Sequence, residues 1–200
     1  MKLSSFKYDL PKKSIAKFPA DPRDSSKMLV MDRETGQLKD KMFSDILNEL
    51  SKGDCLVLND TKVFPARLFG NKEKTNAKIE VLLLRELKSE ERLWDVMVEP
   101  ARKVRIGNKI YFDDNRFYCE VIDNTTSRGR TVRFSYDGNL FDEIEKIGEM
   151  PIPDYIDRDT AQIDKDTYQT VFSNDAHLQS IAPPSAGLHF TEDMLKKIEE

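Results

Sequence analysis

The chain has few of the residues on which several common kinds of protein depend. Its two cysteines, Cys55 and Cys119, are far apart and show no CxxC or Cys/His spacing, which argues against a disulfide framework and a structural zinc site. We interpret both as buried free thiols, each inside a predicted strand. No apolar run is long enough to cross a membrane, and the first residues contain no apolar signal core. We therefore expect a cytoplasmic protein with no membrane partner.

Common catalytic and binding motifs are also missing. The sequence contains no P-loop, no Rossmann glycine fingerprint and no HExxH-type metal motif. Ser185 and His189 suggest a serine nucleophile with a histidine base, but the surrounding PPSAG lacks the strained GxSxG turn that such a nucleophile needs. The acids of residues 156–166 are too evenly spread to single out one catalytic pair. The residues alone therefore indicate no reaction.

Charge is abundant but balanced. Charged residues make up 34% of the 200 positions and the net charge is −4, so this is not a globally basic nucleic-acid binder. Basic residues do gather in two places, each without an intervening acid. Either cluster is explained by a solvated strand face or by contact with a polyanion. The clusters are Arg102, Lys103, Arg105 and Lys109, and Arg128, Arg130 and Arg133.

The first 70 residues predict a mixed α/β arrangement. Residues 27–32 and 37–42 read as a hairpin, and apolar residues at helical spacing from Phe43 to Leu50 predict a helix of about three turns. The continuous apolar run Cys55–Leu58 is typical of a strand buried on both faces. Asn59, Asp60 and Thr61 follow it. They either form a plain turn or lie at the carboxyl end of a buried strand, where open α/β sheets bind ligands.

Five short strands follow, at 79–86, 92–100, 109–114, 117–124 and 129–136, and a short amphipathic helix then ends at Gly148. Evenly spaced short strands predict a small closed barrel. The predicted fold class is a mixed α/β domain interrupted by an inserted small antiparallel β-barrel domain. Its expected limits are 1–70 and 139–200 for the α/β domain and 71–138 for the barrel.

The stretch SIAPPSAGLHFT, residues 180–191, combines two prolines, Gly187 and His189. It is a poor strand and a poor helix. Thr191 followed by acids predicts the N-cap of a helix, so His189 precedes a helix N-terminus, which favours anions. The stretch is either a loop that buries Leu188 and Phe190 and caps a helix, or a substrate loop.

Seven segments, taken in order, resemble one family, the S-adenosylmethionine:tRNA ribosyltransferase-isomerases of the queuosine pathway. Each segment alone is a weak signal, but together they are specific and span nearly the whole chain. They are YDLP at 8–11, PRDSS at 22–26, GDCLVLNDTKVFPARLFG at 53–70, EPARKV at 99–104, GEMPIPDYI at 148–156, YQTVF at 168–172 and APPSAGLHFT at 182–191.

The resemblance implies transfer of the ribosyl part of S-adenosylmethionine to 7-aminomethyl-7-deazaguanine at the wobble position of tRNA. The product is epoxyqueuosine, and adenine and methionine are released. The cosubstrate carries the electrophile, so no metal or redox cofactor is implied. The expected partners are tRNA and S-adenosylmethionine, and we expect a monomer. Family chains continue beyond residue 200, so we expect the C-terminal part of the α/β domain to be absent from these 200 residues.

Carried over by resemblance, the catalytic candidates are His189, Asp60, Arg67 and Tyr168. His189 would transfer protons or orient substrate, and Asp60 would bind an amine or a ribose hydroxyl. Arg67 and Arg158 would bind phosphate or carboxylate. The substrate-binding candidates are Asn59, Thr61, Tyr155, Arg158, Gln169, Thr170, Pro184, Ser185, Ala186, Gly187, Phe190 and Thr191. The candidates for the tRNA backbone are Arg102, Lys103, Arg105, Lys109, Arg128, Arg130 and Arg133.

The sequence departs from the family pattern at a few positions near these candidates. Lys27 stands in place of arginine, Asp154 in place of proline, and Gln179 and Pro183 in place of small residues. Two other interpretations stay open beside the enzyme. One is a non-catalytic tRNA-binding or interaction module of the same fold, and the other is a barrel protein whose polar turns serve only structure.

Overall fold

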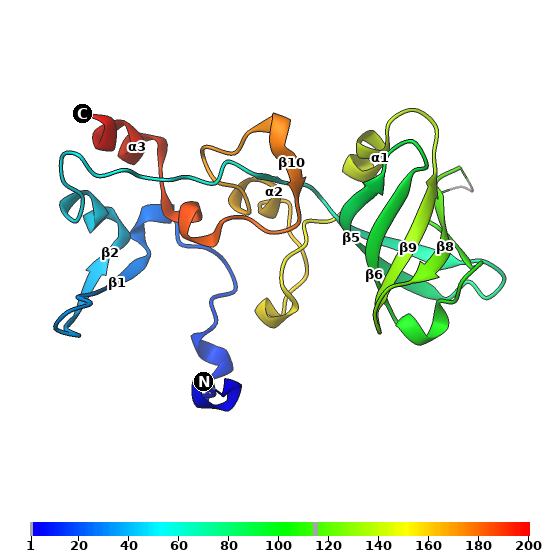
Figure 1. The fold of residues 1–200 in the computed structure, drawn as a ribbon, viewed down its shortest axis with the longest axis horizontal. Coiled ribbons are helices and arrows are strands. Elements are labelled where there is room, and N and C mark those ends of the chain that lie inside the picture. Colours follow the sequence, from blue (N-terminus) through cyan, green and yellow to red (C-terminus); the bar gives the residue numbers. More distant parts are fainter. Residues whose placement is uncertain (1, 114–115) are drawn as a thin grey trace.

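The computed structural model describes residues 2–113 and 116–200. The molecule is elongated, with a β-barrel at one end and a small hairpin and the last helix at the other (Figure 1). Between them lies a central region of short elements and extended chain. The chain passes from the hairpin to the barrel and later returns, so the central region consists of segments that are far apart in the sequence.

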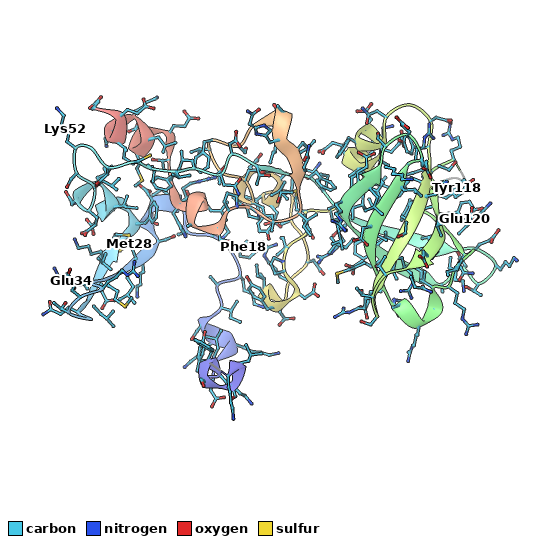
Figure 2. All side chains as sticks on the ribbon, viewed as in Figure 1. Phe18, Met28, Glu34, Lys52, Tyr118 and Glu120 are labelled. Atoms are coloured by element: carbon cyan, nitrogen blue, oxygen red, sulfur yellow. The ribbon has the colours of Figure 1, made fainter. Side chains whose placement is uncertain are left out.

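Six antiparallel strands close the barrel in the order β4-β5-β6-β9-β8-β7. Side chains alternate along each strand, so that Ile79, Val81 and Leu83 of β5 are buried in the interior. Tyr118 and Glu120 of β8 lie on the outside (Figure 2). The strands are β4 (Arg67–Lys72), β5 (Lys78–Lys88), β6 (Leu93–Glu99), β7 (Lys109–Tyr111), β8 (Tyr118–Asn124) and β9 (Gly129–Ser135).

The predicted fold class is confirmed, with one strand more than the pattern indicated. The additional strand is β4, where Gly70 reads as a break in the sequence. A Cβ at Gly70 would lie 2.7 Å from the carbonyl oxygen of Tyr111 and 2.8 Å from Phe112, so glycine is there because the neighbouring chain of the barrel comes close. β4 crosses the expected domain boundary at 71; the domain limits stay a prediction. The strand expected at 109–114 ends at Tyr111, and residue 114 lies outside the described residues.

Helix α1 (Leu140–Ile147) covers one side of the barrel and agrees with the prediction. It begins at Asn139, whose side-chain oxygen accepts a hydrogen bond from the Phe141 N–H at 2.8 Å, and it ends at Gly148. Leu140 and Ile144 pack into the barrel core.

The predicted hairpin is confirmed, whereas the helix after it takes another form. β1 (Lys27–Met31) and β2 (Leu38–Met42) pair antiparallel. Phe43–Asn48 then forms a 3₁₀ helix, η4, instead of three α-helical turns. Phe43 and Ile46 are three residues apart, a spacing that fits the three-residue turn of a 3₁₀ helix as well as an α-helix. Three further 3₁₀ turns precede the hairpin: η1 (Leu3–Phe6), η2 (Lys12–Ser14) and η3 (Arg23–Ser25).

The strand predicted at Cys55–Leu58 is wrong. These residues are extended but belong to no strand, and Val57 is 86% exposed. An apolar run indicates that a segment is suited to burial, but a strand also needs a neighbour, and no described segment pairs with this one. Cys55 is consequently an exposed free thiol, contrary to the expectation, while Cys119 is a buried one as expected.

The central region holds short elements, of which β3 (Lys62–Val63) and β10 (Leu178–Ser180) pair in parallel. A small core around Val63, Met150 and Ile152 lies here, and another joins Phe43 to Phe190 and Met194. The last helix starts at the predicted N-cap, Thr191. The remaining elements are η5 (Ala101–Lys103), η6 (Asp154–Ile156), α2 (Asp164–Thr167), η7 (Asp175–His177), η8 (Ser185–His189) and α3 (Glu192–Glu199).

Candidate active site

Three consecutive residues, Tyr168, Gln169 and Thr170, link the predicted site segments. The Gln169 side-chain amide accepts a hydrogen bond from the Val63 N–H at 3.0 Å and donates one to the Val63 carbonyl at 2.5 Å. The amide thus supplies the two backbone hydrogen bonds that a second neighbouring strand would give β3, in addition to the pairing with β10. Thr170 is buried, and its hydroxyl has no hydrogen-bond partner among the described residues. Its methyl group lies where it would contact a side chain at Gly187. The segment therefore joins β3 to the 184–191 loop.

The 184–191 loop is tightly packed on one side and open on the other. A Cβ at Gly187 would lie 2.8 Å from the Phe172 ring and 3.1 Å from the Thr170 methyl, so only glycine fits there without a shift. The Phe190 ring meets the Phe43 ring edge-on at 4.9 Å, and the His189 ring lies 5.1 Å from Phe43. Ser185 and Ala186 are exposed.

The same loop differs from its sequence interpretation in one respect. Residues 185–189, expected to be a poor helix, form the 3₁₀ turn η8, which a hydrogen bond from the Gly187 N–H to the Pro184 carbonyl closes at 2.8 Å. The N-cap prediction is confirmed, because Thr191 Oγ1 accepts a hydrogen bond from the Met194 N–H at 3.2 Å. No hydrogen bond or ion pair among the described residues joins His189 to Asp60, Arg67 or Tyr168.

Asp60 is paired with His177, a residue that the sequence analysis did not single out. Asp60 Oδ1 lies 2.9 Å from His177 Nδ1, and both side chains are about half exposed. The turn expected at residues 59–61 is present, since Asn59 Oδ1 accepts a hydrogen bond from the Thr61 N–H at 3.0 Å. An ion pair between Lys62 and Asp175 ties the same two segments together. A carboxylate that orients an imidazole is suited to proton transfer.

Arg67 and Tyr168 lie near one another at the junction of the barrel and the central region. Arg67 Nε is 3.0 Å from a Glu80 carboxylate oxygen, and its Nη2 is 3.2 Å from Asp154 Oδ1. Burial raises the pKa of Tyr168, unfavourable electrostatic interaction with the Tyr155 phenol group raises it further, and the Arg67 charge opposes the shift. Tyr168 is therefore a neutral phenol at physiological pH, able to donate a hydrogen bond. Asp154, a departure from the family pattern, supplies one of the two carboxylates on Arg67.

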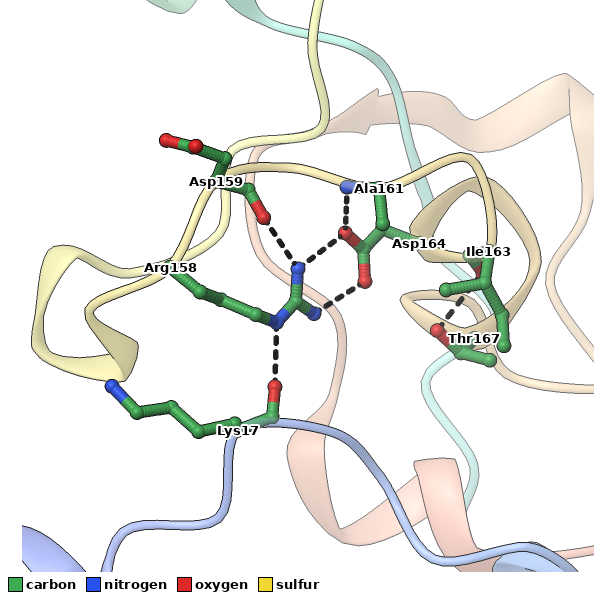
Figure 3. A network of polar contacts seen from close by, with 7 residues as sticks. All are labelled: Lys17, Arg158, Asp159, Ala161, Ile163, Asp164 and Thr167. Atoms are coloured by element: carbon green, nitrogen blue, oxygen red, sulfur yellow. Dashed lines mark hydrogen bonds and ion pairs between the residues drawn. The ribbon is translucent and has the colours of Figure 1, made fainter.

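Arg158 is already bound within the chain (Figure 3). Its guanidinium forms a two-pronged ion pair with Asp164 at 2.6 and 2.8 Å and donates to the Lys17 carbonyl at 2.5 Å and the Asp159 carbonyl at 2.9 Å. It also stacks over Phe18, 4.4 Å from the ring centroid. The substrate role given to Arg158 stays a prediction. In this structure the side chain fastens the N-terminal segment to residues 158–164.

Asp164 is buried and Arg158 is largely shielded, with side-chain exposures of 3% for Asp164 and 13% for Arg158. Burial alone would raise the pKa of the Asp164 carboxyl. Hydrogen bonds from Arg158 and from the Ala161 N–H, together with the Arg158 charge, outweigh it and hold that pKa below its usual value. The hydrogen bond to Asp164 raises the pKa of Arg158.

The predicted tRNA-backbone residues do not share one environment. Arg102, Lys103 and Arg105 are exposed around η5, whereas Arg128 forms an ion pair with Glu99 at 2.8 Å. Arg130 is only 7% exposed, so it differs from the surface position expected of a phosphate ligand. The other two lie on the outer strand faces: Lys109 5.1 Å from the Tyr118 ring and Arg133 exposed on β9.

Two kinds of feature are missing from the described part of the chain. No cluster of three or more His, Cys, Asp or Glu side chains there could hold a metal ion. Within the same residues, no helix has both the length and the apolar character to cross a membrane.

Comparisons with known proteins place this arrangement in a family. The model of the family described as queuosine biosynthesis protein matches residues 3–200. The S-adenosylmethionine:tRNA ribosyltransferase-isomerase of Chloroherpeton thalassium is 58% identical over 201 residues, which cover 100% of this chain and 57% of that protein. The protein of the same name from Cytophaga hutchinsonii is 55% identical, with 100% and 58% coverage. The chain thus spans little more than half the length of these relatives.

A solved structure also matches. The crystal structure of S-adenosylmethionine tRNA ribosyltransferase from Thermotoga maritima is 28% identical, and the match covers 97% of this chain and 53% of that chain with a TM-score of 0.36. Because the family model extends over all but the first two residues, the chain belongs to the queuosine biosynthesis protein family.

Proposed function

We propose that this chain belongs to a tRNA-modifying enzyme that transfers and isomerises the ribosyl part of S-adenosylmethionine. The acceptor is the amine of 7-aminomethyl-7-deazaguanine at the wobble position of tRNA. The observation that carries the proposal is the match of relatives bearing that enzyme's name over the whole chain at 55–58% identity. Contacts of Gln169 with Val63 and of Thr170 with the Gly187 loop support it, because they bring together three segments that carry candidate residues.

The reaction sets definite demands on the site. The sulfonium makes the neighbouring ribose 5′ carbon acidic, and a base must take a proton from it. The bonds from the ribosyl unit to adenine and to the methionine sulfur break, and a bond to the neutral amine forms. The isomerisation closes a new carbon–carbon bond within the ribosyl unit, which fills the two remaining valences. The amine and the 5′ carbon each give up a proton and adenine gains one, so one proton is released overall. Developing charge must be stabilised by fixed dipoles in a site that excludes water.

The described residues offer groups for these tasks. Asp60 and His177 form a hydrogen-bonded pair that can accept or deliver a proton. Tyr168 is a partly buried phenol with a raised pKa, which suits a hydrogen-bond donor to a leaving group or an oxygen of the ribose. His189 keeps its assignment to proton transfer or substrate orientation. The backbone of the 184–191 loop, with Ser185 and Ala186 exposed, is the candidate substrate surface.

A second candidate function is a tRNA-binding module that does not catalyse the reaction. It is favoured by the length of the match, because the chain spans 57–58% of these relatives, and by the closed barrel, which is complete within the described residues. The two functions differ in adenine release and share tRNA binding.

Adenine release from S-adenosylmethionine tests the proposal. The chain is incubated with S-adenosylmethionine and tRNA that carries the deazaguanine precursor, and with tRNA that carries guanine as the matched control. A second preparation fuses the chain to the part of the Chloroherpeton thalassium relative that lies outside the match. We expect precursor-dependent adenine from the fusion, reduced in Tyr168→Phe, which removes only the phenol hydroxyl. If the fusion binds tRNA and releases no adenine, the binding module is the better account.

A further inference from the structure

One end of the barrel carries a cavity lined by cations. Its volume is about 510 Å³, and no acidic side chain of the described residues lines it. The lining comes from two loops that are distant in sequence, the β4–β5 turn and the stretch from η5 to β7. The residues are Lys72, Thr75, Ala77, Arg102, Lys103, Arg105 and Asn108. We call this the basic cavity.

Its cations are available to a ligand. The side chains of Arg102, Lys103 and Arg105 are exposed and make no hydrogen bond or ion pair with any described residue. Lys72 Nζ donates one hydrogen bond to the Lys103 carbonyl at 2.8 Å, which fixes the ammonium against η5 and leaves two of its three protons free. The Asn108 side chain accepts from the Arg105 N–H at 3.0 Å and so shapes the turn that carries Arg105.

Arg130 lies beneath η5 and holds this turn in place. Its Nη2 donates to the carbonyls of Ala101 at 2.9 Å and Val104 at 3.0 Å, the two residues that bracket Arg102 and Lys103. The other guanidinium nitrogens also donate to backbone carbonyls, and Nη1 lies 2.8 Å from the Gly129 carbonyl oxygen. Every hydrogen-bond partner of the guanidinium is thus a neutral carbonyl.

The buried charge of Arg130 is satisfied but not neutralised. No carboxylate of the described residues lies within ion-pair distance of it. Carbonyl dipoles lower the cost of burial, yet the positive charge still contributes to the potential outside η5. Arg102 and Arg105 line a second cavity, of about 310 Å³, together with Arg130 itself. The acid nearest to Arg102 in sequence, Glu99, is paired with Arg128. Within the described residues, Arg102, Lys103, Arg105 and Arg130 therefore form no ion pair with a carboxylate.

We infer that the basic cavity binds phosphodiester groups of an RNA backbone, with Lys72, Arg102, Lys103 and Arg105 as ligands. The inference assigns Arg130 as a positioning residue, which holds the η5 backbone and touches no phosphate. It rests on the proposed function for the identity of the ligand, since the cavity by itself selects phosphate. Guanidinium and ammonium groups without an internal counterion are what a phosphate chain requires.

The salt dependence of binding measures these contacts. Fluorescence anisotropy with a labelled tRNA anticodon stem-loop is followed from 50 to 200 mM KCl. Each phosphate contact contributes a slope of about 0.7–0.9 in log affinity against log salt, which is about threefold in affinity over this range. Between 50 and 200 mM KCl, wild type should therefore lose affinity by a factor about 20–40 times larger than the factor lost by the variant Arg102→Ala/Lys103→Ala/Arg105→Ala. Lys72→Ala alone should remove about one contact.

Lys88→Ala is the matched control. It removes one lysine at the far end of β5, roughly 30 Å along the strand from the basic cavity at about 3.3 Å per residue. It changes the net charge by the same amount as Lys72→Ala, and its slope should equal that of wild type. Equal slopes for Lys72→Ala and Lys88→Ala would overturn the assignment of Lys72.

Arg130→Lys separates positioning from charge. Lysine keeps the positive charge but cannot bridge the two carbonyls, so the slope should fall although the net charge is unchanged. The barrel's single tryptophan, Trp94, is buried and its fluorescence reports whether the barrel is still folded. A folded Arg130→Lys protein with the wild-type slope would overturn the positioning role.

The outcomes also distinguish this inference from the proposed function. If precursor-dependent adenine release and tRNA binding persist while the triple variant keeps the wild-type slope, the RNA lies elsewhere and only this inference fails. If the wild-type chain binds no stem-loop at 50 mM KCl, the inference fails as well. Inorganic phosphate at matched ionic strength should displace the stem-loop from wild type more than from the triple variant. Equal displacement would contradict a phosphate-selective cavity.

Discussion

Replacing Asp164 with asparagine tests whether the Arg158–Asp164 ion pair holds the central region together. Removing one partner of a buried ion pair costs about 3–5 kcal/mol, because the other charge stays buried without compensation. Asp164 is buried and Arg158 is largely shielded, so this range applies, less about 1 kcal/mol for the hydrogen bond that the asparagine oxygen still accepts. We expect Asp164→Asn to lower the free energy of unfolding by about 2–4 kcal/mol. At about 2–4 °C per kcal/mol for a chain of this size, the melting temperature should fall by about 4–16 °C.

The assay is urea unfolding followed by far-ultraviolet circular dichroism, with Asp159→Asn as the matched control. Asp159 is an exposed neighbour that contributes its backbone carbonyl to Arg158, so the control should stay within about 0.5 kcal/mol of wild type. The double variant Asp164→Asn/Arg158→Met should lose less unfolding free energy than the two single variants lose in total. Each single change leaves one buried partner without its ion pair, whereas the double change removes both partners.

The pH dependence of this effect has a definite sign. The folded state lowers the pKa of Asp164 below its ordinary value of 3.8, chiefly because the hydrogen bonds and charge of Arg158 and the Ala161 N–H overcome the effect of burial. A group of this kind stabilises the fold above its unfolded pKa and loses that contribution as pH falls through the folded pKa. The difference in unfolding free energy between wild type and Asp164→Asn should be constant from pH 7 to about 5 and shrink below about pH 4. No difference at pH 7, or an equal loss of unfolding free energy in Asp159→Asn, would refute the reasoning.

Three further predictions concern the site and the two cysteines. Gly187→Ala should destabilise the protein by about 1–3 kcal/mol in thermal unfolding, because the new methyl group would lie 2.8 Å from the Phe172 ring. Ala186→Ser, at an exposed position, should have little effect, and equal melting temperatures for the two variants would contradict the close packing of the loop. Cys55 should react with a thiol reagent in the native state and Cys119 only after unfolding, since Cys119 is buried and burial raises the pKa of its thiol. Rapid reaction of both thiols in the native state would contradict the closed barrel. Asp60→Asn should change the unfolding free energy by less than about 1 kcal/mol, because the pair of Asp60 with His177 is exposed. The same substitution should reduce adenine release by the fusion protein, and unchanged release would show that Asp60 takes no part in the chemistry.

The barrel was predictable from the sequence because each strand buries one face and exposes the other. Residues 79–83 alternate in this way, and the pattern alone indicates a strand. The sequence does not predict β4, because Gly70 resembles a turn residue. Glycine is needed at this position because residues 110–112 come close to it, and that is a tertiary contact. The Cys55–Leu58 run shows the opposite failure. Its composition suits a buried strand, but no local signal states which segment would pair with it.

The candidate site was predictable only in part, for a related reason. Tyr168, Gln169 and Thr170 were singled out through resemblance, and their contacts with Val63 and the Gly187 loop became visible only in the fold. His177 could have been noticed as the second histidine, but nothing near it in sequence points to Asp60, 117 positions earlier. Arg130 looked like a surface cation because burial of a charged side chain depends on carbonyls supplied by a distant turn.

Isotope tracing tests the central claim most directly. The fusion protein is given precursor-bearing tRNA and S-adenosylmethionine labelled either in the ribose carbons or in the methyl group, and the wobble nucleoside is analysed by mass spectrometry after digestion. We expect the ribose label to enter the nucleoside, the methyl label to leave with methionine, and unlabelled adenine to be released. Methyl label in the tRNA, or ribose label that stays with adenine in solution, would contradict it.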